Sequence, residues 1–300
     1  MECLIYMVND EKIIDGINPD ILKDVQVLRN FKEDLDPKKK KVFIVDTLPN
    51  DPEVLPLKEK WKVFDKIVFK SFLQKTLYNT YFDIPHSAGT VIRDAVNPMK
   101  SHTKTKDTIN IVYHAEPYVG LDLVYIAFRT LAADYENLKL DIYTAKGEYA
   151  WSENDETFSE LFRLINEHPQ ITNYGHKSPK EVRDGLENGN IFVAPGTIMQ
   201  ATNERLLEAM SAGLICVHSS HGALPELGMN LTYMYEYTED KQQHLNMLHH
   251  HLKSAIESVL HPNKDLQNNL ELQKNIIDTL HDINYKSKEW EKMFKGLLTT

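Results

Sequence analysis

The spacing of apolar and polar positions predicts strands that alternate with helices over most of the chain. Before residue 100, short apolar runs bounded by polar residues predict strands at residues 4–8, 41–46 and 66–69. Between the first two runs, apolar residues recur at near-helical spacing over residues 21–31, which predicts a helix. A polar stretch that contains proline follows at residues 97–104, and we expect the linker between two domains there.

The second part of the chain is patterned more regularly than the first. We expect strands at residues 109–114, 138–143, 171–174, 190–194 and 214–218. We expect helices at residues 121–132, 157–167, 178–186 and 203–212, the third capped by Ser178 and the last followed by Gly213. This order predicts a doubly wound parallel sheet, which binds ligands at the carboxyl ends of its strands. After about residue 240 the pattern predicts helices alone.

Composition places the chain among two-domain globular proteins of a reducing compartment. The length is 300 residues, 42% of them hydrophobic, with a mean hydropathy of −0.43. The opening apolar run is too short for a signal peptide, and no stretch approaches the ~20 apolar residues of a membrane span. Two cysteines far apart predict no disulfide framework. We therefore expect a cytoplasmic protein. A net charge of −10 argues against non-specific binding to nucleic acid.

The common cofactor motifs are missing from the sequence. It contains neither the dinucleotide glycine fingerprint nor the phosphate-binding loop with its lysine. Paired C-x-x-C and H-E-x-x-H motifs are also absent, and the run at residues 249–251 has no histidine three or four residues from His244. We therefore expect no metal site and no bound cofactor.

The most informative segment joins a strand at residues 191–194 to a helix at residues 203–212. Backbone N–H groups and the helix dipole make such a helix start an anion site, with Thr202 or Asn203 as the N-cap. Glu204 and Glu208 lie four residues apart and share a helix face. Such a like-charge pair is unusual inside an α/β domain unless a ligand donates hydrogen bonds to one of the carboxylates.

Residues 208–213 (Glu-Ala-Met-Ser-Ala-Gly), together with residues 222–226 (Gly-Ala-Leu-Pro-Glu), resemble the donor site of glycosyltransferase family 4. The resemblance implies the GT-B fold, an α/β fold of two Rossmann-like doubly wound domains that face a cleft, here with a reduced N-terminal domain. We expect an acceptor-side domain at residues 1–100 and a donor-binding domain at residues 101–300, with C-terminal helices that cross back to the first domain. The compact form is similar to viral and phage enzymes, which would place it in a host cytoplasm.

The resemblance also assigns roles to single residues. Glu208 matches the glutamate that binds the donor ribose, and Gln200 stands where the family has a glutamate that contacts the transferred sugar. The backbone amides that hold the diphosphate match three residues that precede or begin the helix: Ala201, Thr202 and Asn203.

Other stretches fit the same family. Residues 111–122 resemble the first strand and loop of the donor domain, which contain Gly120, and residues 173–176 resemble the nucleobase loop, which contains Tyr174. We expect His221, in the loop at residues 219–222, to line the same pocket. Residues 65–75 and 92–98 are similar to the late acceptor-domain strand and helix and to the domain-closing segment.

Besides Gln200, three further family positions differ in this chain. The arginine and lysine that neutralise the donor diphosphate are replaced by His114 and Val119, so that Arg205 becomes the candidate for the missing charge. The histidine of the acceptor domain is also missing, and Val45 and Asp46 occupy its place. Asp46 is the candidate to bind or orient an acceptor hydroxyl.

We therefore expect a transferase that moves a sugar from a nucleotide-diphosphate donor to a hydroxyl of a glycan or small molecule. The resemblance implies a retained anomeric configuration and no need for metal. One alternative is a phage-type enzyme that modifies hydroxymethylated bases in DNA. Another is a non-catalytic nucleotide-sugar binder or scaffold, because Gln200, Val119 and Val45 have lost the charge or base of the family. The sequence leaves the donor base, the sugar and the oligomeric state open.

Overall fold

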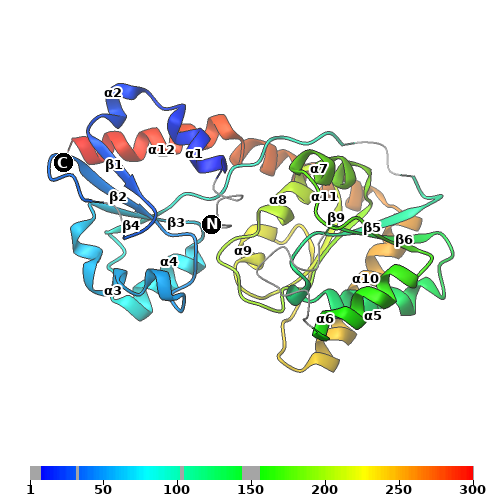
Figure 1. The fold of residues 1–300 in the computed structure, drawn as a ribbon. Helices are drawn as coiled ribbons and strands as arrows, with labels where there is room; N and C mark the ends of the chain where they lie inside the picture. The colour runs from blue at the N-terminus through cyan, green and yellow to red at the C-terminus, as the bar shows by residue number, and fades with distance from the viewer. Residues whose placement is uncertain (1–7, 32–33, 102–104, 144–155, 300) are drawn as a thin grey trace. The chain divides into compact units, whose positions relative to one another are not determined.

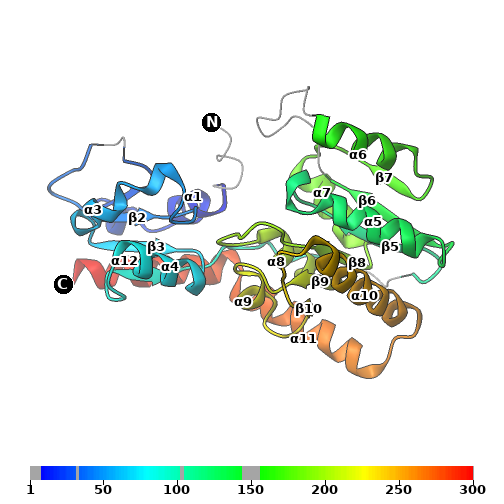
Figure 2. The same cartoon turned by 90° about the horizontal axis from the view of Figure 1, so that it is seen from below.

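The computed structural model describes residues 8–31, 34–101, 105–143 and 156–299, and the chain divides into two compact units (Figure 1). The first unit comprises Met1–Asn97, Gln200–Thr202 and Thr279–Thr300. The second comprises Pro98–Met199 and Asn203–Asp278. The last helix of the chain, α12 (Ile283–Leu298), is therefore part of the first unit, as Figure 2 shows in red.

Within the described residues, the first unit is built on a four-stranded parallel sheet in the order β1-β2-β3-β4. Its strands are β1 (Val25–Leu28), β2 (Lys40–Ile44), β3 (Lys66–Phe69) and β4 (Gly89–Val91). Neighbours along the chain are also neighbours in the sheet. The carboxyl ends of consecutive strands therefore lie next to one another along one edge.

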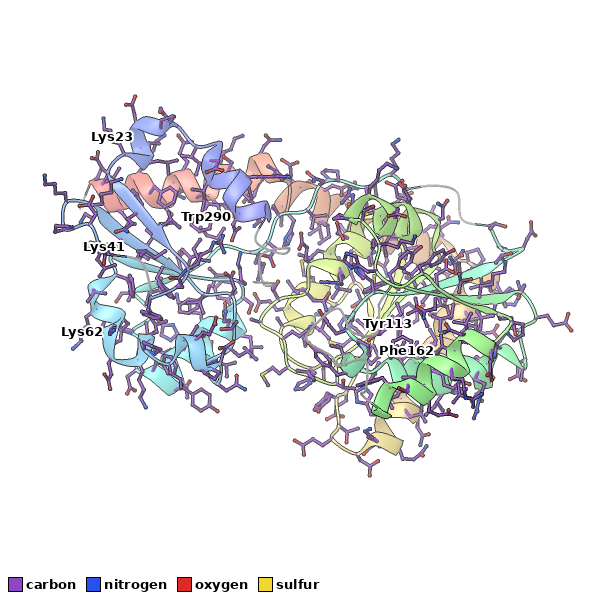
Figure 3. All side chains as sticks on the ribbon, viewed as in Figure 1. Lys23, Lys41, Lys62, Tyr113, Phe162 and Trp290 are labelled. Carbon is purple, nitrogen blue, oxygen red and sulfur yellow. The ribbon has the colours of Figure 1, made fainter. Side chains whose placement is uncertain are left out.

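Helices cover both faces of the first sheet, because successive strand residues point to opposite sides. One face packs against α1 (Val8–Asp15) and α12 in an apolar cluster that includes Trp290, which is fully buried. The other face packs against α4 (Phe72–Phe82) in a cluster that includes Tyr78. Figure 3 shows Trp290 directed into the interior of this unit, whereas Lys23 and Lys62 extend from its surface.

For the first unit, one expected helix is wrong, and one expected strand lies almost entirely outside the described residues. The helix expected at residues 21–31 is wrong, since α2 ends at Leu22 and Val25–Leu28 forms β1. A short apolar run fits either element, and parallel pairing with β2 together with two β-branched valines favours the strand. The strand expected at residues 4–8 lies outside the described residues except for Val8, which begins α1.

The described part of the second unit contains a six-stranded parallel sheet in the order β10-β9-β8-β5-β6-β7. Its strands are β5 (Ile109–Tyr113), β6 (Leu138–Ile142), β7 (Ile171–Asn173), β8 (Ile191–Ala194), β9 (Ile215–Ser219) and β10 (Tyr233–Tyr235). The first five confirm the predicted strands. The three-residue β10 is an addition at the edge, too short to leave a periodic signal.

The predicted helices of this unit are also confirmed, as α5 (Leu121–Ala132), α6 (Glu156–Glu167), α7 (Pro179–Asn188) and α8 (Glu204–Ser211). Further helices are α9 (Leu224–Gly228), α10 (Lys241–Leu260) and α11 (Lys264–Leu280). Tyr113 and Phe162, labelled in Figure 3, belong to the apolar core that α5, α6 and α10 form with the sheet. None of the helices in the described ranges is long and apolar enough to cross a bilayer.

The strand order of the second sheet reverses next to β5. Strands β5, β6 and β7 run outward in one direction, and β8 then pairs with the other side of β5. In open α/β sheets, ligands bind beside the carboxyl ends of the two strands at such a switch point. The loops after β5 and β8 are therefore where we expect a ligand in this unit.

Candidate functional site

Helix α8 (Glu204–Ser211) follows β8 (Ile191–Ala194) after a loop of nine residues, and β8 is one of the two strands at the switch point. Asn203 is its N-cap, and the Asn203 side chain accepts a hydrogen bond of 2.9 Å from the N–H of Leu206. Of the two caps considered, the structure selects Asn203. The dipole and first-turn N–H groups of a helix favour an anion, so this end of α8 suits a phosphate group.

Gly120 allows the loops after β5 and β8 to pack closely. Its φ of +105° lies in the left-handed region, and a Cβ there would stand 2.9 Å from the Cβ of Pro195. The hydroxyl of Thr197 also donates a hydrogen bond of 3.0 Å to the carbonyl of Tyr118. The two loops at the switch point thus form one continuous surface, which a side chain at position 120 would disrupt.

Aromatic residues follow β5, β6 and β7. The His114 ring meets Tyr143 edge to face at 6.3 Å between centroids, and Tyr143 stacks on Tyr174 at 4.9 Å and 8°. Tyr174 is 41% exposed, so it presents an aromatic surface to solvent at the predicted nucleobase position. Burial, with the nearby His176, lowers the pKa of His114 to about 4. His114 is therefore neutral at pH 7 and supplies no cation for a diphosphate.

His221 joins the loop after β9 to the loop after β8. Its Nδ1 lies 2.8 Å from the carbonyl oxygen of Gly196, which can only accept a hydrogen bond. The Nδ1 atom therefore carries the proton, and the ring stacks on Tyr237 at 3.7 Å and 16°. A second contact thus fixes the orientation of His221 at the same edge of the sheet.

Glu208 is a half-buried carboxylate with a defined partner. Its Oε1 accepts a hydrogen bond of 2.9 Å from the Nη1 of Arg183 on α7. Burial raises the pKa of Glu208, against the opposing charges of Arg183 and Arg205. Burial also lowers the pKa of Arg205 to about 10, which still leaves a cation at neutral pH in the first turn of α8. Glu208 is thus not an exposed surface residue.

The loop before α8 is shared between the units. Gln200, Ala201 and Thr202 belong to the first unit, and the second unit resumes at Asn203. Ala201 is buried, Gln200 is half-buried, and the hydroxyl of Thr202 donates a hydrogen bond of 2.5 Å to Asp94. The predicted sugar-contacting and diphosphate-binding residues are therefore divided between the two units.

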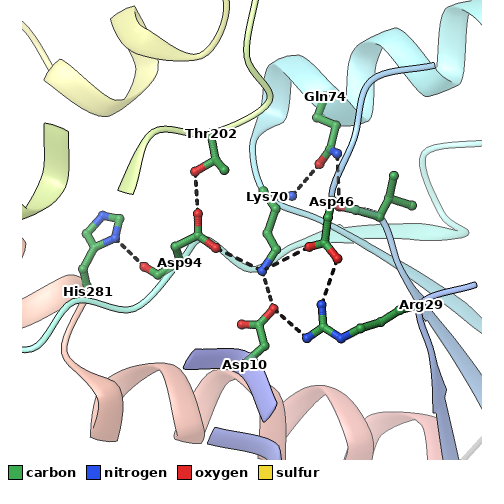
Figure 4. Close-up of polar contacts among 9 residues, drawn as sticks. Asp10, Arg29, Asp46, Lys70, Gln74, Asp94, Thr202 and His281 are labelled. Atoms are coloured by element: carbon green, nitrogen blue, oxygen red, sulfur yellow. Dashed lines mark hydrogen bonds and ion pairs between the residues drawn. The ribbon is translucent and has the colours of Figure 1, made fainter. Parts of the chain in front are cut away.

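Asp46 follows β2 at the carboxyl edge of the first sheet. Its Oδ2 accepts a hydrogen bond of 2.8 Å from Arg29, and its Oδ1 lies 3.8 Å from the Nζ of Lys70 (Figure 4). Lys70 also contacts Asp94, the partner of Thr202. The structure therefore brings the predicted residues Asp46 and Thr202 into one network.

Sequence reasoning did not single out several residues of these networks, among them Arg29, Lys70, Asp94, Tyr143 and Arg183. A signal was present for Lys70, because it is a lysine directly after a predicted buried strand. Asp94 follows β4, which the sequence pattern did not predict. Arg183 lies inside a predicted helix, where its partner on another helix cannot be read from spacing.

Among known proteins, this chain is similar to solved structures. No family model and no curated protein matches the chain. A glycosyltransferase from Rickettsia africae matches with a TM-score of 0.71 at 13% identity, over 98% of this chain and 82% of that chain. The sucrose-phosphate synthase of Thermosynechococcus elongatus matches with a TM-score of 0.68 at 12% identity, over 87% of this chain and 69% of that chain.

The pneumococcal O-GlcNAc transferase GtfA, solved with UDP and GlcNAc, matches with a TM-score of 0.66 at 12% identity. The match covers 88% of this chain and 53% of GtfA, so the chain spans about half the length of that protein. The fold is that of the GT-B glycosyltransferases. The GT-B fold predicted from the donor-site residues is therefore confirmed.

Proposed function

We propose that this GT-B protein transfers a sugar from a nucleotide-diphosphate donor to a hydroxyl acceptor. The main support is the switch point of the second sheet, where the N-terminus of α8 and the half-buried Glu208 both belong to one short helix. A helix N-terminus suits a diphosphate, and a carboxylate one turn further along suits ribose hydroxyls. The solved complexes of GtfA and of Anabaena HepE, both with UDP, suggest a uridine donor.

In this mechanism the second unit holds the donor. The nucleobase stacks on Tyr174, the ribose donates hydrogen bonds to Glu208, and the N-terminus of α8 stabilises the charge that develops on the leaving diphosphate. Because the helix terminus and Arg205 meet that charge, the reaction needs no metal ion. The family resemblance further implies that the anomeric configuration is retained.

The first unit presents the acceptor hydroxyl in this proposal. Asp46 is the carboxylate for that hydroxyl, at the carboxyl edge of the first sheet. The acceptor is a glycan or small molecule with a free hydroxyl group. A DNA acceptor is disfavoured, because the chain carries a net charge of −10 and Asp46 lies beside two further aspartates.

A ligand screen followed by a product assay tests the proposal. UDP, GDP, ADP and CDP and their sugar conjugates are compared by thermal shift, since a ligand that binds the native state raises the melting temperature. One nucleotide family should stabilise the protein and should fail to stabilise Glu208→Ala. The matching nucleotide sugar should then give free nucleotide and a glycoside of the donor's anomeric configuration, also in EDTA. No shift with any nucleotide contradicts the proposal.

A non-catalytic nucleotide-sugar binder is the second candidate. The observation in its favour is the weak positive charge at the loop after β5, where His114 is neutral at pH 7 and Val119 is buried. A binder would show the thermal shift but would release no free nucleotide from the donor, so turnover separates the two candidates.

A further inference from the structure

Charged side chains follow three consecutive strands at the carboxyl edge of the first sheet. Asp46 lies after β2, Lys70 directly after β3, and Asp94 after β4 (Figure 4). Asp10, on α1, points into the same group, and Arg29 reaches it from the end of β1. All five residues belong to the first unit, which gives this edge three carboxylates and two cations.

Lys70 is the centre of this network. Its side chain is only 4% exposed, and its Nζ contacts Asp10 directly, Asp94 at 3.0 Å and Asp46 at 3.8 Å. Burial alone would lower the pKa of Lys70, but the charges of Asp94, Asp10 and Asp46 outweigh burial and raise it above its usual value. The ammonium group therefore keeps its proton and cannot serve as a base.

The backbone around Asp46 is fixed as well as its side chain. Gln74, fully buried on α4, donates hydrogen bonds of 3.0 and 2.8 Å to the carbonyls of Val45 and Thr47, the two neighbours of Asp46. The same amide accepts a hydrogen bond of 2.6 Å from the N–H of Lys70. One side chain therefore sets the spacing between the ends of β2 and β3.

The carboxylates of this network differ in their access to solvent. The side chain of Asp46 is 25% exposed, whereas those of Asp10 and Asp94 are 4% and 15% exposed. Arg29 occupies the Oδ2 of Asp46, while the Oδ1 faces Lys70 at a distance longer than a hydrogen bond. Asp46 is thus the carboxylate best placed to accept a hydrogen bond from a ligand.

Asp94 extends the network to the loop before α8. Its Oδ2 accepts the hydrogen bond from Thr202, and its Oδ1 contacts Lys70. Its backbone carbonyl also accepts a hydrogen bond of 2.9 Å from the Nδ1 of His281, just before α12. Lys70 therefore lies between Asp46 and Asp94, and Asp94 in turn binds Thr202.

We propose that Lys70 is a positioning residue for sugar transfer, which fixes Asp46 toward the acceptor hydroxyl and Asp94 toward Thr202. The inference rests on the proposed function and adds a residue that neither sugar nor nucleotide contacts. An ammonium group suits this task, since its one compact positive charge faces three carboxylates, with Asp10 and Asp94 at hydrogen-bond distance and Asp46 at 3.8 Å. The planar fork of an arginine would pair with one carboxylate and leave the others misplaced.

The test separates positioning from folding with a charge-matched variant. Lys70→Met alone leaves three carboxylates against one cation and is expected to fold poorly. In the double variant Lys70→Met/Asp10→Asn, the carboxylates of Asp46 and Asp94 and the single cation of Arg29 remain, so that the excess of one negative charge is the same as in the native network. Lys274→Met is the control, because Lys274 is a partly buried lysine of the second unit that pairs with Asp278 at 2.8 Å.

The assay uses the nucleotide sugar that stabilises the native protein most and glycerol as a minimal hydroxyl acceptor. We expect the charge-matched variant to lose about 100-fold in kcat/KM for glycerol, the usual cost of a misplaced reacting group. Its Kd for the donor should stay within about twofold of the native value, because the altered residues lie apart from Tyr174, Glu208 and the N-terminus of α8, which hold the donor in this proposal. Lys70→Arg should recover only part of the loss, and Lys274→Met should match the native kcat/KM.

Two results would overturn the inference in distinguishable ways. A folded charge-matched variant with native kcat/KM for glycerol would show that Lys70 has only a structural role, and the proposed function would stand. A native protein that binds no nucleotide sugar would contradict the proposed function, and the inference would fail with it.

Discussion

The two sheets carry different chemistry at their carboxyl edges. At the first sheet, charged side chains from separate strands contact one another, with the buried Lys70 among three aspartates. At the second sheet, the same edge carries a helix N-terminus, stacked aromatic rings and the neutral His114. Both edges are carboxyl ends of parallel strands, yet one is built from side-chain charges and the other from backbone dipoles and rings.

This difference suggests a division of labour. Backbone N–H groups and aromatic faces suit a nucleotide diphosphate, because the helix terminus can meet its negative phosphates and the rings can stack on its flat base. A carboxylate held by cations suits a single hydroxyl group, which needs an exact orientation more than a strong field. The second edge is therefore the donor side of our account, and the first edge is the acceptor side.

Lowering the pH should give the largest effect, a fall in the free energy of unfolding that is greater in the second unit than in the first. Burial lowers the pKa values of His114, His218 and His281 to about 4, so in each case the unfolded chain takes up a proton first as the pH falls below about 6.5. The free energy of unfolding should then fall by about 1.4 kcal/mol per pH unit for each histidine, down to pH of about 4. Two of the three lie in the second unit.

Hydrogen exchange in each unit between pH 7 and pH 5 measures this difference. The second unit should lose stability more steeply than the first, because most of the histidines with lowered pKa belong to it. His218→Asn should flatten the slope of the second unit, because it removes a buried group that the unfolded chain protonates before the folded protein does. Equal slopes in the two units would contradict the prediction.

Loss of Glu208 should give the next largest effect and should be confined to the donor side. Glu208→Ala removes the acceptor for the ribose hydroxyls, which should weaken donor binding about 100-fold, as expected for two hydrogen bonds to a charged group. Isothermal titration with the selected nucleotide sugar measures the loss. Glu187→Ala, on α7 in the same unit, serves as the matched control and should bind the donor normally. If Glu208→Ala binds the donor with native affinity, Glu208 is not part of the donor site.

Loss of the Tyr174 ring should give the smallest effect on donor binding. Tyr174→Ala removes the exposed face next to Tyr143 and should weaken donor binding about tenfold, because base stacking on an aromatic side chain contributes roughly 1–3 kcal/mol. Tyr174→Phe keeps the ring and should bind normally in the same titration. A loss as large in Tyr174→Phe as in Tyr174→Ala would mean that the hydroxyl group, not stacking, carries the contact.

The elements at the carboxyl edge of the second sheet could be predicted largely from sequence, for a physical reason. Its parts are contiguous along the chain: the β8 strand, a short loop, the Asn203 cap and Glu208 follow one another within a single βα unit. Strong periodicity also gave five strands and four helices of this unit. In contrast, the short β10 and the pairing of Glu208 with Arg183 depend on tertiary packing, which spacing does not encode.

The acceptor side could be predicted only in part. Asp46 was identified through the family resemblance, but its network comes from single residues scattered between Asp10 and Thr202. Residues 25–28 fit a helical period as well as a strand period, because four residues are too few to separate the two, and only the pairing with β2 decides for a strand. Without β1 and β4, neither Arg29 nor Asp94 could be placed at the edge of the sheet.

The central claim is that the two edges have separate tasks, and a crossed comparison of two variants tests it most directly. Donor Kd and kcat/KM for glycerol are measured for Glu208→Ala and for Lys70→Met/Asp10→Asn. We predict that Glu208→Ala loses donor binding, while the charge-matched variant binds the donor normally and loses transfer. Equal loss of donor binding in both variants would contradict the account, because the two edges would then act on the same ligand.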